Sequence, residues 1–151
     1  MTLNNIYSNQ VDQDEYPSSV RVPLDDFFKD DRGEILNILL SPITSVARIT
    51  SIAGSVRANH YHKTDWHYAF VEIGQILYFE RPIGSKDIPD PIIFNPGQMF
   101  FTRPNIEHAM LFSKDTIFYT FARNMRNHEN HESDLSRVSF VTQEIIDRFF
   151  P

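Results

Sequence analysis

Short runs of β-branched and aromatic residues, each ended by turn-forming residues, fill the chain from about residue 20 to residue 141. Turns such as Asp31-Arg32-Gly33 and Asn95-Pro96-Gly97 separate these runs. Strands this short, at spacings of roughly 8–12 residues, are typical of an antiparallel sandwich or barrel. We therefore predict an all-β fold. The expected strands are residues 34–40, 45–53, 56–62, 66–73, 75–81, 91–94, 99–102, 108–112 and 116–122.

The two ends of the chain depart from this pattern. Residues 1–19 are polar and rich in Asn, Gln and Asp, and we interpret them as a mobile arm. Near the other end, Thr142 can cap a short helix that runs to Phe149, with Glu144 in its first turn. A chain of 151 residues suits one domain, so residues 20–151 are expected to form a single β-barrel.

Composition restricts the partners of the chain. Lys and Arg number 14 against 20 Asp and Glu, and the net charge of −6 disfavours nucleic acid but still allows a local pocket for a phosphorylated small molecule. Because the chain has no cysteine, any transition metal would sit on imidazole and carboxylate ligands. No run approaches the roughly 20 apolar residues of a membrane span, and the N-terminus lacks the features of a secretory signal. We expect a cytoplasmic protein without a membrane partner.

Histidines are the strongest functional signal. His60, His62 and His67 fall within one short stretch, and a strand sends residues two apart to the same face. A polar turn at residues 63–65 would let His67 lie opposite the first two rings in a hairpin, and His108 follows a further turn. Imidazoles that converge inside a barrel leave open coordination positions, as catalytic metal sites require. This geometry predicts one divalent metal held by His60, His62, His67 and His108.

The spacing of Gly54, His60-x-His62, His67 and Gly74 resembles the first conserved motif of the cupin superfamily. The segment from Gly97 to His108 is similar to the second motif. The resemblance implies a cupin-type jelly-roll barrel. Cupins usually have Glu where this chain has His67, so the implied metal site is an all-histidine variant, for Fe, Zn, Ni, Mn or Cu.

A narrower set of residues resembles the nucleotide-sugar ketoisomerase branch of cupins. It comprises Asp31-Arg32-Gly33, Arg57-x-x-His60-x-His62-Lys63, Phe112-Ser113-x-Asp115 and Glu132-x-Asp134-x-x-Arg137. Those enzymes move a keto group between neighbouring carbons of a deoxysugar nucleotide, without a metal. The resemblance implies that His60 and His62 act as catalytic acid and base, which suits the ordinary imidazole pKa.

Three further side chains are candidates for substrate binding. Arg57 could hold an anionic group, although strict strand alternation places it opposite His60 unless a bulge intervenes. Tyr78 and Tyr119 could ring the mouth of the barrel, although such residues are more often ordinary sheet surface. We interpret His128 and His131, in a polar stretch, as solvated loop residues. Exposed sheet edges and many aromatic residues favour a homodimer.

Three functions are compatible with these residues. The first is a metal-dependent cupin enzyme that acts on a small polar or carbonyl-bearing molecule. The second is a metal-free nucleotide-sugar ketoisomerase or epimerase of polysaccharide biosynthesis, with activity insensitive to chelators. The third is a ligand-binding cupin without turnover. All three need the same barrel and the same inward histidines, so the sequence alone does not separate them.

Overall fold

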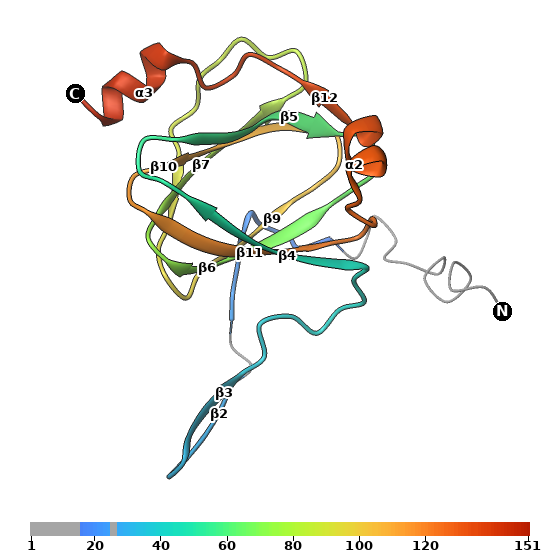
Figure 1. Ribbon diagram of the computed structural model, residues 1–151, viewed down its shortest axis with the longest axis vertical. Helices are drawn as coiled ribbons and strands as arrows, with labels where there is room; N and C mark the ends of the chain where they lie inside the picture. The colour runs from blue at the N-terminus through green and yellow to red at the C-terminus, as the bar shows by residue number, and fades with distance from the viewer. Residues whose placement is uncertain (1–15, 25–26) are drawn as a thin grey trace, which may run out of the picture.

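The computed structural model describes residues 16–24 and 27–151, so most of the expected N-terminal arm lies outside the described residues. Two five-stranded antiparallel sheets face each other in a sandwich (Figure 1). The first sheet contains, in order, β1 (Arg21–Val22), β9 (Met99–Thr102), β6 (His67–Ile73), β11 (Thr116–Ala122) and β4 (Ser45–Ser51). The second contains β12 (Leu135–Arg137), β5 (Val56–His62), β10 (Ile106–Phe112), β7 (Ile76–Pro82) and β8 (Ile92–Phe94).

This architecture confirms the predicted all-β jelly roll, and most strands lie where the sequence placed them. β5, β9 and β11 have the predicted bounds. The expected strand 34–40 is shorter, because β3 (Gly33–Leu36) ends where Leu36 pairs with Phe27 of β2 (Phe27–Asp30). The sequence analysis missed β1, β2, β12 and helix α2 (His128–Asp134).

The space between the sheets has an apolar half and a polar half. Alternation along the strands sends large side chains such as Phe94, Phe112 and Phe118 into one half, where all three are fully buried. Burial of such side chains contributes about 1.5–3 kcal/mol each to stability. The other half receives buried histidines together with Thr102 and Thr120. The apolar half therefore stabilises the sandwich, and the polar half can hold functional side chains.

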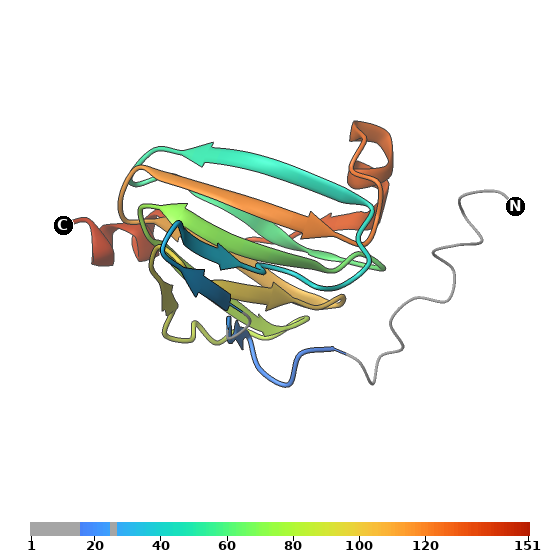
Figure 2. The ribbon, with the colours of Figure 1, turned by 90° about the horizontal axis from the view of Figure 1, so that it is seen from below.

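A second apolar cluster covers the outer face of the second sheet. Leu77, Phe79, Ala109 and Leu111 point outward there and pack against residues of the C-terminal segment, including Ile145 of α3 (Gln143–Phe149). Helix α3 confirms the predicted C-terminal helix, with Thr142 in the N-cap position but without a side-chain cap hydrogen bond. Figure 2 shows α2 and α3 at opposite ends of the sandwich.

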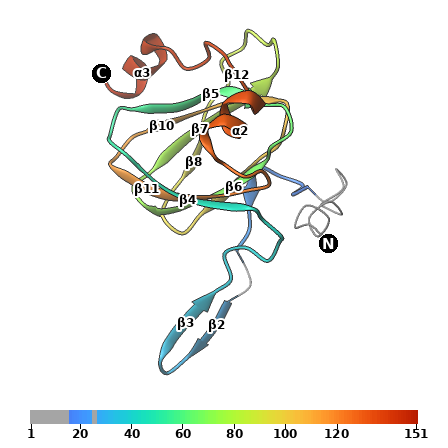
Figure 3. The ribbon, with the colours of Figure 1, turned by 45° about the vertical axis from the view of Figure 1, so that its right-hand side comes forward.

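Strands β2 and β3 form a separate two-stranded ribbon that projects away from the sandwich (Figure 3). Its register pairs Phe27 with Leu36 and Phe28 with Ile35. Because neighbouring residues of a strand point to opposite faces, the ribbon is apolar on both faces. Neither of the two helices among the described residues has the length and apolar character needed to cross a membrane.

Gly74, in the turn between β6 and β7, is the glycine that the fold tolerates least as a substitution site. Its φ is +95°, and a Cβ atom there would collide with the Thr116 side chain and the Asp115 carbonyl oxygen. We expect Gly74→Ala to lower the free energy of unfolding by at least about 2 kcal/mol, through backbone strain and steric displacement together.

Gly84→Ala is the matched control, because Gly84 has a φ of +81° but nothing within 4 Å of the added Cβ. It should cost only the conformational penalty of about 1 kcal/mol. Urea unfolding of both variants measures the difference. Equal losses would show that the Gly74 turn does not approach Thr116 as described.

Candidate active site

A β-bulge in β5 sets the direction of its side chains. Ala58 and Asn59 have positive φ values of 69° and 54°, and the register with β10 shifts between the pairs His60–His108 and Ala58–Ala109. The Asn59 side chain holds this conformation, because its amide donates to the Val141 carbonyl oxygen at 3.0 Å and its oxygen accepts from the Val141 amide at 2.9 Å. The strand beyond the bulge turns His60 and His62 into the polar half of the sandwich.

The structure brings the four predicted histidines together. His60 and His62 come from β5, His108 from β10 and His67 from the start of β6 in the opposite sheet. The expected hairpin between His62 and His67 is wrong, because residues 63–66 cross from one sheet to the other and His67 faces the first rings across the interior. Ring centroids of neighbouring histidines lie 4.7–5.8 Å apart.

A fifth imidazole joins this cluster from helix α2. The His131 ring lies 5.6 Å from that of His62 and 6.3 Å from that of His60, and its side chain is partly buried. The interpretation of His131 as a solvated loop residue is therefore wrong. The sequence did contain a signal for the start of this helix. Asn127 is a favourable N-cap residue, and its side chain caps α2 by accepting from the Asn130 amide at 2.9 Å. His128, at the start of the helix, is exposed.

The Asp134 carboxylate connects α2 to the turn between the sheets. One oxygen accepts from the Thr64 amide at 2.9 Å and from the Thr64 hydroxyl at 2.6 Å, and the other accepts from the Asp65 amide at 3.0 Å. The second oxygen also lies 3.4 Å from Nδ1 of His62, within ion-pair distance but long for a hydrogen bond. Asp134 thus places a negative charge directly behind one ring of the cluster.

Burial keeps the clustered imidazoles neutral. It lowers the pKa of His60 to about 2, with the neighbouring histidines adding to the effect. It lowers the pKa of His108 to about 3 and that of His62 to about 4, although Asp134 opposes the shift at His62. The pKa of His67 also falls well below its ordinary value, chiefly through burial. The protonated form of His62 is therefore stabilised by the neighbouring carboxylate of Asp134.

The tautomer of His108 follows from its backbone contact. Its Nδ1 lies 3.2 Å from the Ile106 carbonyl oxygen, so Nδ1 carries the proton and Nε2 presents a lone pair to the cluster. Nε2 of His108 and Nδ1 of His60 are buried and have no hydrogen-bond partner among the described residues. Such atoms are available to a ligand that enters the polar half.

The candidate substrate-binding residues are placed differently from one another. Tyr78 is buried beside the cluster, with its ring 6.4 Å from that of His108 and its hydroxyl hydrogen-bonded to Thr102 and Glu80, both at 2.9 Å. Tyr119 lies on the outer face of the first sheet, because it alternates with Phe118 and Thr120, which are buried inside. The structure does not bring Tyr119 to the histidines.

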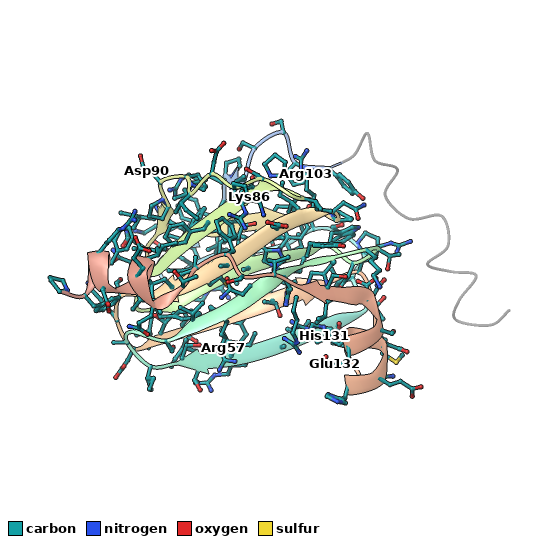
Figure 4. The ribbon with its side chains drawn as sticks, turned by 90° about the horizontal axis from the view of Figure 1, so that it is seen from above. Arg57, Lys86, Asp90, Arg103, His131 and Glu132 are labelled. Atoms are coloured by element: carbon teal, nitrogen blue, oxygen red, sulfur yellow. The ribbon has the colours of Figure 1, made fainter. Side chains whose placement is uncertain are left out.

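Arg57 faces the inner side of its strand because of the bulge, opposite the inward Met110. Its guanidinium is turned to β4, where it donates to the Ser51 hydroxyl at 2.7 Å and to the Thr50 carbonyl oxygen at 2.9 Å. In Figure 4, His131 and Glu132 lie on α2, and Arg57 lies nearer to the α3 end of the sandwich than they do. The structure places Arg57 as a bridge between the two sheets.

The possible metal ligands form a smaller group than expected. Among the described residues, His60, His62 and His108 offer nitrogen atoms that all lie within 4.8 Å of one another. His67 does not belong to this group.

Comparison with known proteins identifies the fold. No protein-family model and no curated protein matches the chain. Among solved structures, a 3,4-ketoisomerase from Helicobacter canadensis is similar with a TM-score of 0.62 and 18% identity, over 85% of this chain and 95% of that one. The sugar 3,4-ketoisomerase QdtA from Thermoanaerobacterium thermosaccharolyticum, solved with TDP, has a TM-score of 0.60 and 18% identity, over 84% and 91%. A dTDP-4-dehydrorhamnose 3,5-epimerase from Sulfolobus tokodaii has a TM-score of 0.60 and 19% identity, over 78% and 75%.

These neighbours correct the prediction of a divalent transition metal, which is wrong. They are sugar epimerases and ketoisomerases, which are metal-independent, and the sequence resembles the ketoisomerase branch of cupins. The physical reason for the error is that the same inward imidazoles serve either purpose, so that spacing alone does not distinguish ligands from acids and bases. The chain has the cupin-like jelly-roll fold that these sugar-nucleotide enzymes share.

Proposed function

We propose that this protein is a metal-free nucleotide-sugar 3,4-ketoisomerase, in which His60 and His62 move protons beside the keto group of a TDP-linked deoxysugar. The observation that carries the proposal is the cluster of buried, neutral imidazoles in the polar half of the sandwich, with Asp134 behind His62. The fold supports it, because structural neighbours include 3,4-ketoisomerases solved with TDP and with TDP-4-keto-6-deoxyglucose.

The reaction needs only proton transfers. Neutral His62 takes the proton from the carbon beside the carbonyl, and the electrons of that C–H bond form a C=C bond while the carbonyl oxygen becomes an oxyanion. The proton of the neighbouring hydroxyl moves to that oxygen, with His60 as the relay. Protonated His62 then returns its proton to the former carbonyl carbon, and the neighbouring carbon becomes the ketone. Both histidines are restored and no oxidant is needed.

Asp134 makes His62 the better base of the two. A carboxylate 3.4 Å from Nδ1 stabilises the imidazolium that forms when the ring accepts a proton. Burial would raise the pKa of Asp134, but hydrogen bonds from Thr64 and the Asp65 amide hold that pKa below its ordinary value. Asp134 therefore stays ionised while His62 cycles between its two forms.

The first prediction from the proposed function concerns turnover. In D2O, the purified protein should convert TDP-4-keto-6-deoxyglucose to the 3-keto isomer and incorporate deuterium at the exchanging carbon, observed by NMR. His62→Asn and His60→Asn should each lower the rate by about 100-fold or more, the usual effect of losing a general acid or base. Addition of EDTA should leave the rate unchanged.

His128→Asn is the matched control, since His128 is exposed on α2 and should leave the rate unaltered. Deuterium uptake without a new ketone would indicate epimerisation instead. Saturable binding of TDP with neither product nor deuterium would show a ligand-binding protein and reject the enzyme.

The second prediction concerns the pH dependence of stability. The ordinary pKa of 6.5 applies to unfolded histidines, whereas folded His60, His62 and His108 have pKa values of about 2, 4 and 3. Between these values the unfolded state binds more protons, so stability falls as the pH is lowered from 7 to 5. Each buried histidine should contribute a loss of about 1–2 kcal/mol by pH 5.

Asp65 acts in the opposite direction, because burial raises its pKa from 3.8 to about 6 and protonation then stabilises the folded state. The stability lost through three histidines between pH 7 and pH 5 exceeds the stability gained through this one carboxyl group. Urea unfolding at pH 7, 6 and 5 gives the slope, and His108→Gln should reduce it. Stability that is constant or rises toward pH 5 would show that the rings are not held neutral.

The homodimer is also a proposal, and the β2–β3 ribbon supports it. Phe27, Phe28 and Ile35 are 54%, 57% and 61% exposed, on both faces of the ribbon. An isolated two-stranded ribbon is marginally stable at best in water, and its exposed apolar faces need a cover. We propose that the ribbon packs on a second copy of this chain.

The third prediction tests this contact. Phe28→Ser combined with Ile35→Ser removes the apolar groups of one ribbon face and should convert a dimer to a monomer, as measured by size-exclusion chromatography with light scattering. Ile93→Ser is the control, since Ile93 is 47% exposed on β8 and away from the ribbon. A wild-type monomer at micromolar concentration, or a dimeric double variant, would contradict the proposal.

A further inference from the structure

Arg126 lies in the loop between β11 and α2, and its side chain turns back into the sandwich. Its Nη1 donates to the Thr120 hydroxyl at 2.9 Å. Thr120 is 2% exposed and lies on the inner face of β11, two residues before Ala122. Ala122 pairs with His67 across the first sheet. The guanidinium is therefore anchored in the polar half of the interior, on the side of His67.

The positive charge of Arg126 has little compensation from the protein. None of the carboxylates among residues 16–24 and 27–151 lies within the 4.0 Å of an ion pair with it. Asp65 acts on it only from a longer distance. Burial lowers the pKa of Arg126 and raises that of Asp65. A guanidinium has several N–H donors, and the described residues engage Arg126 through Thr120 alone. A partly buried cation in this condition is suited to an incoming anion.

The histidines face this charge. Arg126 contributes to the lowered pKa values of His62, His67 and His131, as a nearby positive charge does. The acidic group that acts on it is Asp65 in the crossing turn, whereas Asp134 at the end of α2 lies against His62. The guanidinium and the acid–base rings therefore border the same space.

The chemistry of the proposed function calls for a cation at this point. Removal of a proton beside a ketone creates an oxyanion, and the imidazolium that then forms on His62 has the Asp134 carboxylate as its counter-charge. Arginine stays charged at every working pH and donates in a planar fork that matches oxygen acceptors. Preorganised donors aimed at a developing oxyanion are among the largest contributions to enzymatic rate acceleration.

We propose that Arg126 binds the reacting carbonyl oxygen of the keto-sugar and stabilises the negative charge that develops there. The inference rests on the proposed ketoisomerase function and adds a residue that the sequence resemblance did not include. A guanidinium could also hold the diphosphate of the nucleotide, but the anchor on buried Thr120 turns it toward the polar half of the sandwich, where the histidines lie.

The test compares Arg126→Gln and Arg126→Lys with the wild-type protein on TDP-4-keto-6-deoxyglucose. For Arg126→Gln, kcat should fall by about 100-fold or more, the usual loss for one oxyanion donor, while KM changes less than about threefold. Arg126→Lys should recover part of kcat, because it keeps the charge. The dissociation constant of TDP, measured by calorimetry, should be unchanged in both variants.

Arg123→Gln is the control, since Arg123 belongs to the same loop and its side chain, among the described residues, donates only to neighbouring Asn124, at 3.4 Å. Thermal unfolding of every variant checks that the loop is folded, and Arg126→Lys keeps the test decisive if the Gln variant unfolds. A raised KM and a weakened TDP affinity at constant kcat would assign Arg126 to the diphosphate and overturn the proposal. Unchanged kinetics in both variants would also overturn it, with the ketoisomerase function intact. An inactive wild-type protein would remove the proposed function itself.

Discussion

The candidate site depends on the contacts of the Asp134 carboxylate. Its hydrogen bonds to Thr64 and the Asp65 amide tie the end of α2 to the turn that crosses between the sheets. The same group lies behind His62 and favours the protonated form of that ring. One side chain therefore holds the turn between the sheets and sets the basicity of one ring, so a change at Asp134 alters geometry and electrostatics together.

Desolvation gives the cluster its chemical character. Several imidazoles in one buried space cannot all be charged, because each imidazolium would lose its hydration and would repel the other charged rings. The low pKa values of His60 and His108 follow, with burial as the first cause and the neighbouring rings as the second. The rings accept and relay protons, but the charge that His62 gains is balanced by Asp134 and not by the oxyanion. Arg126, whose charge faces the same rings, supplies what they lack.

The sequence predicted the fold from its short strands and turns, and strand alternation placed His60 and His62 on one face, whereas His67 joins them from the opposite sheet and not through the expected hairpin. The β-branched and aromatic content of β5, β9 and β11, with the turn residues between the runs, defined those strands to the residue. The same alternation excludes Tyr119 from the interior, since it falls between Phe118 and Thr120. The bulge at Ala58 and Asn59 was not predictable from periodicity, because the Asn59–Val141 hydrogen bonds that hold it join residues far apart in the chain.

The polar segment before β12 was the main failure of the sequence analysis. Helix α2 has no buried residue and hence no apolar stripe to mark it, so His131 read as a loop residue. Arg126 carried no signal either, because its role depends on the Thr120 hydroxyl and on the fold of the loop. The metal assignment failed for a different reason, since spacing identifies where imidazoles meet but not which chemistry they perform.

Nitrogen-15 NMR of the imidazole side chains, recorded from pH 8 to pH 4 on the folded protein, measures the central claim directly. The account predicts that the rings of His60 and His108 stay neutral at pH 5, where the same residues in the urea-unfolded chain are protonated, and that His62 is the first of the three to gain a proton. Protonation of His60 or His108 near pH 6.5 would contradict it, because rings charged in that range are not buried against one another and could not form the neutral acid–base cluster.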